Sequence, residues 1–371
     1  MKWRDCSVGL GVIALLAGAG GGCGELFHVG TTTTTGSGGT GTAAAGPGGQ
    51  QSSSSGTGGA PACTAGACQV AGEYCNPASG ACEACTELDR FQFGAPQPLG
   101  LTAAGYNALY PRVDGDTQDL YLDLQSVSSH LDQLAVAHAT SGTPAWPTAS
   151  LLPQLGGSHN DRGPLYLADP SLLSGLIDPT LAKSGMPVLL FDSDRMGSRL
   201  IFAVPLQGST PSSLLLPTDA TQASQVAMAM AAPTPRLFWV GDGAGSTSVR
   251  LLTGTASASV PPVSVTITLD SGCPAPLAGT PWVTPAGDLL LFTSPRYEAS
   301  PGCAVDDATV THLYQVPLDA TGQPTGPATP VFADDASIDA TPSLTPDQCT
   351  LLFARVDVSS STAQIYAATR D

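Results

Sequence analysis

The sequence predicts an all-β protein made of many short strands. Gly and Pro account for 43 and 32 of the 371 residues, a share that disfavours helices and favours strands joined by turns. Residues 280–292 repeat at 341–353 without gaps, and a further strand follows each copy. The last copy stops one strand short of four, whereas residues 91–99 read as a strand with no unit before them. These observations predict a β-propeller of four-stranded blades whose ring is closed by the N-terminal strand.

The repeat consists of a strand, a turn, an apolar strand, a loop and another strand. The two clearest copies share Thr, Pro, Thr, Pro, Leu, Leu and Phe at identical offsets. Looser copies cover residues 110–137, 178–204 and 226–252, and the middle one is expected to open with a strand at 178–185. Five blades result, and a sixth could lie between residues 143 and 174.

Two further features complete the predicted ring, which spans residues 90–371. Segments that contain Pro, such as residues 261–267, supply outer strands, because an edge strand tolerates Pro. Residues 91–99, placed beside residues 365–369, close the ring and remove the edges that a linear array would expose.

The two best copies resemble the TolB-type propeller repeat. In that family a Pro-x-x-Ser-Pro-Asp-Gly-like turn precedes an apolar strand that ends in Phe or Tyr. Residues 285–287 and 346–347 keep parts of that turn, with Thr in place of Ser, and residues 192–197 are similar to the hairpin that follows the strand. The resemblance implies a periplasmic protein that acts through protein contacts at the envelope. The family residues build turns and are not known as a catalytic set.

The N-terminus has the features of an export signal. Basic residues precede an apolar run at residues 8–19, which is too short to span a bilayer. Residues 20–23, Gly-Gly-Gly-Cys, resemble a bacterial lipobox with Gly in place of the usual Leu, and Ala17-Gly18-Ala19 offers a general cleavage site instead. We expect a signal peptide at residues 1–22 and lipidation of Cys23, which gives an outer-membrane lipoprotein facing the periplasm or the surface. Free secretion is the alternative.

A flexible tether and a small Cys-rich module precede the ring. Residues 23–62 contain the anchor cysteine and a stretch of Gly, Ser, Thr and Ala that cannot bury enough surface to fold. Residues 63–86 form a module that we expect to be held by disulfides, with open connectivity among Cys63, Cys68, Cys75, Cys82 and Cys85.

The three remaining distant cysteines lie within the ring. Cys273 and Cys303 flank one strand pair and are expected to bond to each other. Five module cysteines leave one over, and Cys349 is its candidate partner, which would clip the module to the propeller. The alternative is a buried, reduced Cys349.

Familiar catalytic patterns are missing from the sequence. The five His residues form no HExxH or HxH pair, and there is no GxSxG elbow or phosphate loop. The ring contains one Glu, Glu298, and most of its Asp residues are expected in turns, namely Asp114, Asp116, Asp192, Asp194, Asp288 and Asp347. We therefore expect no catalytic residues, no metal and no cofactor.

One polar cluster, His159, Asn160, Asp161 and Arg162, stands out as a candidate binding loop. It follows Gly156-Gly157 in what the sequence predicts to be a long connection between blades, where binding residues often lie. A solvated loop without function is the alternative.

The net charge of −17 disfavours nucleic acid as a partner, and the lipid anchor is the expected membrane contact. The leading hypothesis is a non-enzymatic, envelope-anchored scaffold that binds an envelope protein or a glycan. One alternative is a polysaccharide-acting hydrolase or lyase in which Arg162, Arg195 or Arg296 grips an acidic sugar; another is a structural surface protein. Asp, Arg and His converging on the central channel would favour the hydrolase or lyase, and small residues there would favour the scaffold.

Overall fold

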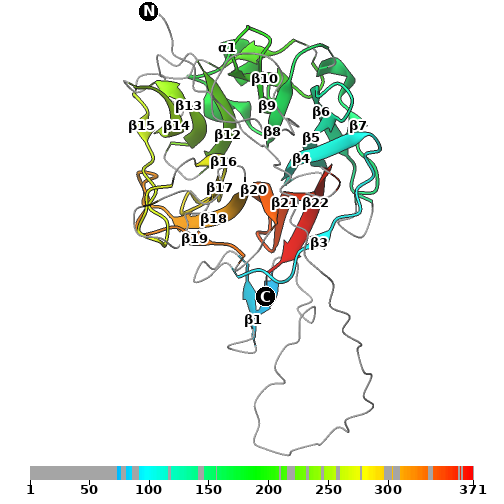
Figure 1. Cartoon of the computed structure of the whole chain (residues 1–371). Coiled ribbons are helices and arrows are strands. Elements are labelled where there is room, and N and C mark those ends of the chain that lie inside the picture. Colours follow the sequence, from blue (N-terminus) through cyan, green and yellow to red (C-terminus); the bar gives the residue numbers. More distant parts are fainter. Residues whose placement is uncertain are drawn as a thin grey trace, which may run out of the picture.

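The computed structural model describes residues 73–76, 81–85 and 92–370, except 116–117, 141–145, 156, 209, 215–221, 231–233, 244–245, 256–259, 276–277, 296–302, 304–309, 333–336, 358–359 and 361. Five four-stranded antiparallel sheets surround a central axis, and a separate two-stranded hairpin precedes them (Figure 1). The prediction of an all-β, five-bladed propeller is confirmed.

Each blade begins at the axis with its inner strand and ends in a short outer strand. Blade A contains β4 (Tyr106–Val113), β5 (Leu120–Ser126), β6 (Asp132–Ala137) and β7 (Ser150–Leu151). Blade B contains β8 (Asp161–Leu167), β9 (Val188–Ser193), β10 (Leu200–Pro205) and β11 (Ser212–Ser213). Blade C contains β12 (Ala223–Ala229), β13 (Arg236–Gly243), β14 (Ser246–Thr255) and β15 (Val263–Ser264).

The last two blades follow the same order. Blade D contains β16 (Gly279–Val283), β17 (Leu289–Pro295), β18 (Thr311–Pro317) and β19 (Thr329–Pro330). Blade E contains β20 (Ile338–Leu344), β21 (Thr350–Asp357), β22 (Thr362–Thr369) and, as its outer strand, β3 (Gln97–Pro98). The hairpin consists of β1 (Glu73–Asn76) and β2 (Ala81–Ala84).

Helical structure in the described residues is limited to short turns. These are the 3-10 helices η1 (Pro153–Leu155) and η2 (Pro170–Leu173) and the α-helix α1 (Pro179–Ala182). A search of these described residues finds no helix with the length and apolar character needed to cross a membrane.

The ring closes as the sequence predicts. Strand β3 pairs with β22, and the Leu99 N–H donates to the Ile365 carbonyl at 2.9 Å. A disulfide joins Cys85, which precedes β3, to Cys349 in the turn between β20 and β21, and the Arg370 guanidinium donates to the Cys85 carbonyl. Closure therefore combines strand pairing with a covalent bond across 264 residues of sequence.

The other cysteines divide between described and undescribed parts of the chain. Cys273 is bonded to Cys303, with a Cα–Cα distance of 5.6 Å. In the hairpin, Cys75 lies opposite Cys82, which is disulfide-bonded. The predictions for Cys23, Cys63 and Cys68 lie outside the described residues.

The inner strand of blade B was predicted at the wrong place. Residues 178–185 contain α1 instead of a strand, because the Asp178 side chain accepts the Thr180 N–H at 2.7 Å and Pro179 occupies the first helical position. The inner strand is β8, at Asp161–Leu167. The segment considered for a sixth blade therefore supplies the inner strand of blade B.

Each inner strand contains one bulge at an equivalent position. The register between inner and second strand shifts there in all five blades. The residue in the bulge has a left-handed backbone, with φ between 45° and 60°, and is Tyr110, Gly163, Gln225, Thr280 or Thr341. A left-handed residue of this kind costs conformational energy unless the surrounding contacts hold it in place.

The bulge turns its N–H toward the preceding blade. Tyr110 N–H donates to Thr341 Oγ1 at 3.1 Å, and Gln225 N–H donates to Asp192 Oδ2 at 3.1 Å. Thr280 N–H donates to Gln225 Oε1 at 2.5 Å. These bonds connect neighbouring blades at the axis, and they place polar side chains in the interior of the ring.

An apolar cluster fills each of the five contacts between neighbouring blades. Phe191 lies between blades A and B, Trp239 between B and C, Phe292 between C and D, and Phe353 between D and E, and each is fully buried. The core therefore lies between sheets, as expected for stacked sheets that each bury two faces.

Replacing Thr341 with Val tests the contact between blades E and A. The substitution keeps the shape of the side chain but removes the oxygen that accepts the N–H of buried Tyr110. The free energy of unfolding should fall by about 1–3 kcal/mol, as for a buried donor left without a partner. Urea unfolding measures it, with exposed Thr325→Val as the control, expected to change stability by less than about 0.5 kcal/mol. Equal losses in the two variants would contradict this role.

Candidate functional site

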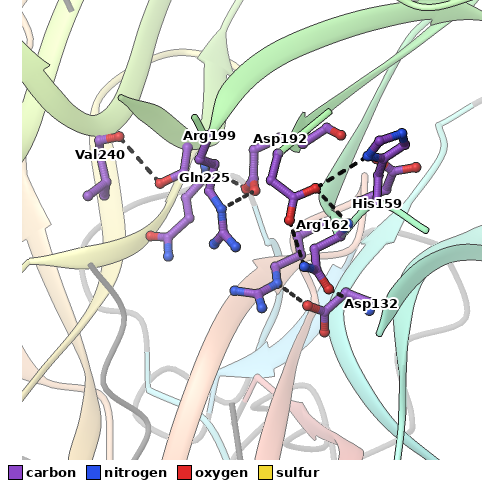
Figure 2. Close-up of polar contacts among 12 residues, drawn as sticks. Asp132, His159, Arg162, Asp192, Arg199, Gln225 and Val240 are labelled. Carbon is purple, nitrogen blue, oxygen red and sulfur yellow. Dashed lines mark hydrogen bonds and ion pairs between the residues drawn. The ribbon is translucent and has the colours of Figure 1, made fainter. Parts of the chain in front are cut away.

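Charged side chains of blades A and B come together beside Gln225 of blade C (Figure 2). Asp132 opens β6, Arg162 is the second residue of β8, Asp192 lies near the end of β9, and Arg199 directly precedes β10. Neighbouring strands are antiparallel, so the end of one strand and the start of the next lie on the same side of the ring. These four residues therefore share one side. We call Asp132, Arg162, Asp192 and Arg199 the inner cluster.

Asp132 and Arg162 form a buried ion pair across blades A and B. Arg162 Nε donates to Asp132 Oδ2, and Gln125 Nε2 donates to Asp132 Oδ1 at 2.9 Å. The Asp132 side chain is 0% exposed and that of Arg162 is 6% exposed. Burial raises the pKa of the Asp132 carboxyl, against the opposing effects of Arg162 and Gln125. This carboxyl is therefore a candidate proton carrier.

Asp192 is the second buried carboxylate of the inner cluster. Its Oδ2 accepts the Gln225 N–H, and its Oδ1 lies 3.4 Å from Arg199 Nε. A Cβ at Gly163 would lie 3.6 Å from Asp192 Oδ2 and 3.5 Å from the Tyr110 ring. These are ordinary contact distances, so the reason for glycine at position 163 is its left-handed backbone, with φ +60°.

Polar side chains cross the interior of the ring beside Asp192. Gln225 Nε2 donates to the Tyr110 hydroxyl at 3.2 Å. Farther along β4, Arg112 Nη1 donates to the Pro342 carbonyl at 2.6 Å and Nη2 to the Pro281 carbonyl at 3.3 Å. Burial lowers the pKa of Arg112 to about 10. The interior of the ring therefore contains hydrogen-bonded side chains of several blades.

The candidate binding loop is divided between surface and interior. Asp161 and Arg162 are the first two residues of β8 and are buried, so the prediction of a loop between blades is wrong for them. Asn160 lies just before β8, and its N–H and Nδ2 donate to the Asp194 carboxylate at 3.0 and 2.7 Å. His159 is 46% exposed, with Nδ1 3.8 Å from Asp194 Oδ1.

Asp161 belongs to a second type of ion pair. Its Oδ1 accepts from Arg195 Nη2 at 2.8 Å, and the Arg195 guanidinium lies over the rings of Phe191 and Phe202. Burial raises the pKa of the Asp161 carboxyl.

Blade E repeats this arrangement. Asp339 accepts two hydrogen bonds from Arg355, at 2.7 and 2.8 Å, and the Arg355 guanidinium lies over the rings of Phe353 and Tyr366. Since the same combination occurs in two blades, we assign it to the packing of the fold.

The sequence analysis missed three members of the inner cluster, Asp132, Asp192 and Arg199. Asp192 was assigned to a turn, but it lies within β9 and is fully buried. Asp132 was not identified, because its local sequence does not indicate that it pairs with Arg162, 30 residues later. Arg296, named as a possible sugar ligand, lies outside the described residues. Within the described residues, no group of three or more His, Cys, Asp or Glu side chains is arranged to hold a metal ion.

Comparison with known proteins gives similarity in structure only. No family model and no curated sequence matches the chain. A structure described as TolB from Agrobacterium tumefaciens is 12% identical, with a TM-score of 0.38 and coverage of 71% of this chain and 83% of that one. An α-L-arabinofuranosidase from Lactobacillus brevis is 12% identical (TM-score 0.46, coverage 71% and 90%), and a glycosyl hydrolase from Bacteroides ovatus is 10% identical (TM-score 0.42, coverage 71% and 84%). These likenesses concern the propeller fold alone.

The comparisons correct the prediction of a protein without enzymatic activity. Several of the solved structures that match this chain are glycoside hydrolases. Fold does not determine function, so the missing motifs were no ground for that prediction.

Stability should depend on pH through Asp132. Because its pKa is raised, the folded protein keeps a proton in a range where the unfolded chain has released it. The contribution of Asp132 to stability is therefore highest below the ordinary aspartate pKa of about 4 and is lost as the pH rises through the raised pKa. Asp132→Asn cannot titrate, so its stability relative to the parent should increase with pH in urea unfolding.

Asp178→Asn is the matched control with the opposite sign. The hydrogen bonds from Thr180 lower the pKa of exposed Asp178, so the parent gains stability there as the pH rises. The relative stability of this variant should decrease with pH. Parallel curves for the two variants would contradict the role assigned to Asp132.

Proposed function

We propose that the chain is a polysaccharide-acting hydrolase whose centre is the inner cluster. The observation that carries this proposal is the convergence of two buried carboxylates, Asp132 and Asp192, with two arginines. The sequence criterion for the hydrolase was Asp, Arg and His converging on the central channel, and the cluster supplies its Asp and Arg residues but no His.

The two carboxylates suit the two roles of glycoside hydrolysis. That reaction uses one carboxylic acid to protonate the leaving oxygen and one carboxylate as nucleophile or general base. Asp132 is the candidate acid, because burial raises its pKa. Asp192 is the candidate carboxylate, because it accepts the Gln225 N–H and lies beside Arg199. Arg162 is a positioning residue that orients Asp132.

The net charge of the chain favours a neutral sugar. The chain as a whole carries −17. An acidic sugar would meet repulsion from the protein. The proposal therefore replaces the acidic sugar considered from the sequence with an uncharged polysaccharide.

The test measures the release of reducing sugars by the full chain from a panel of neutral and acidic polysaccharides. Asp132→Asn and Asp192→Asn should each lower kcat/KM at least about 100-fold on the best substrate, in line with the loss of acid–base catalysis. Asp339→Asn is the matched control, because it removes a buried carboxylate from an Arg pair outside the cluster, and it should change the rate less than about threefold.

Thermal unfolding of each variant establishes that it is folded. Full activity in folded Asp132→Asn, or no hydrolysis of any polysaccharide by the parent, would overturn the proposal.

We further propose that the protein is exported and anchored through Cys23. The disulfides Cys85–Cys349 and Cys273–Cys303 support export, because such bonds persist in oxidising compartments. On expression in a Gram-negative bacterium, Cys23→Ser should move the protein from the membrane fraction to the soluble fraction, whereas Cys6→Ser should not. Mass spectrometry of the N-terminal peptide should find acyl chains on Cys23 of the parent. An unmodified residue 23 would overturn the anchor.

A further inference from the structure

We propose that residues 157–160, before β8, form a latch that controls access to the inner cluster, an inference that rests on the proposed hydrolase. Asp132, Arg162 and Asp192 are buried, with side chains 0%, 6% and 0% exposed. A polysaccharide cannot contact carboxylates in this state. Catalysis at this centre therefore requires a segment that moves aside.

Asn160 is the residue that connects the segment to its surroundings. Its N–H and Nδ2 donate to the Asp194 carboxylate in the turn between β9 and β10. Its Oδ1 accepts the N–H of Asp132 at 3.2 Å. One side chain thus joins the backbone of the candidate acid in blade A to a turn of blade B, directly beside the Asp132–Arg162 ion pair.

The contacts of the latch lie closer to solvent than the carboxylates beneath it. The Asp194 side chain is 35% exposed and that of His159 is 46% exposed, whereas Asp132 is 0% exposed (Figure 2). Hydrogen bonds in contact with water exchange at low cost, because water replaces the lost partner. Gly157 and Gly197 flank the two sides of the contact, and Gly197 has φ +83°. Opening therefore breaks few bonds and disturbs no apolar core.

A disulfide between residues 160 and 194 can hold the latch closed. Asp161 pairs with Ser193 in the β8–β9 register, so Asn160 and Asp194 are the next opposed pair. Opposed Cα atoms in antiparallel strands lie about 4.5–5.5 Å apart, within the range that a disulfide spans. Asn160→Cys with Asp194→Cys, oxidised with glutathione disulfide, gives the closed form. Asn160→Ser with Asp194→Ser gives a matched variant without the latch contacts.

Accessibility of the carboxylates is the first readout and needs no substrate. Carbodiimide coupling of an amine to Asp132 and Asp192, followed by mass spectrometry, should be at least fivefold slower in the oxidised Cys variant than in the Ser variant. Dithiothreitol should restore it, with the Ser variant treated alike to control for the two native disulfides. Exposed Asp319 should label equally in all forms. Asn160→Ala, which needs no disulfide, should label Asp132 faster than the parent.

Hydrolysis is the second readout, and it separates the latch from the proposed function. Loss of at least 90% of hydrolysis on oxidation, reversed by reduction, together with slower labelling, supports both. Slower labelling in a protein that hydrolyses no polysaccharide supports the latch and overturns the hydrolase. Equal labelling of the oxidised Cys and Ser variants, with Asp319 unchanged, overturns the latch.

Discussion

The structure depends on hydrogen bonds that three of the inner strands direct out of their own blades. A bulge forces one residue per inner strand into a left-handed backbone, and in blades A, C and D its N–H reaches an oxygen of the preceding blade. The strained backbone is stabilised only when the neighbouring blade is in place. Closing the ring with β3 and the Cys85–Cys349 bond therefore also holds these strained residues in position.

The same bulge determines which side chains reach the axis. In blade C its N–H needs an acceptor, and Asp192 of blade B supplies one from inside a strand. Gly163, the left-handed residue of blade B, lies beside that carboxylate and the Tyr110 ring. Requirements of packing and of charge therefore meet at one point, where blades A, B and C contribute side chains.

The fold could be predicted from the sequence because its signals are local. A repeated turn before an apolar strand, a strand missing after the last copy and a lone strand before the first copy determine the blades and their closure. The inner strand of blade B was placed incorrectly, because Asp178-Pro179 starts a short helix where a strand was expected. The inner cluster could not be predicted, because the partners of Asp132 and Asp192 come from other strands and blades. The residues next to Asp192 in the sequence are also typical of a turn, so they do not reveal that it lies in β9.

The repeat shows which charges recur among the blades. The position two residues before the left-handed residue is Asp161 in blade B and Asp339 in blade E, each paired with an arginine over aromatic rings, and Ala in the other blades. The position of Asp192 in the second strand is buried Asp123 in blade A, Val240 in blade C, Thr293 in blade D and Ala354 in blade E. Since three blades pack without a carboxylate there, the propeller does not need one in every blade. A buried carboxylate costs free energy unless other groups compensate it. In blade B the compensating groups are Arg199 and the Gln225 N–H, which join Asp192 both to the inner cluster and to the packing of blade C.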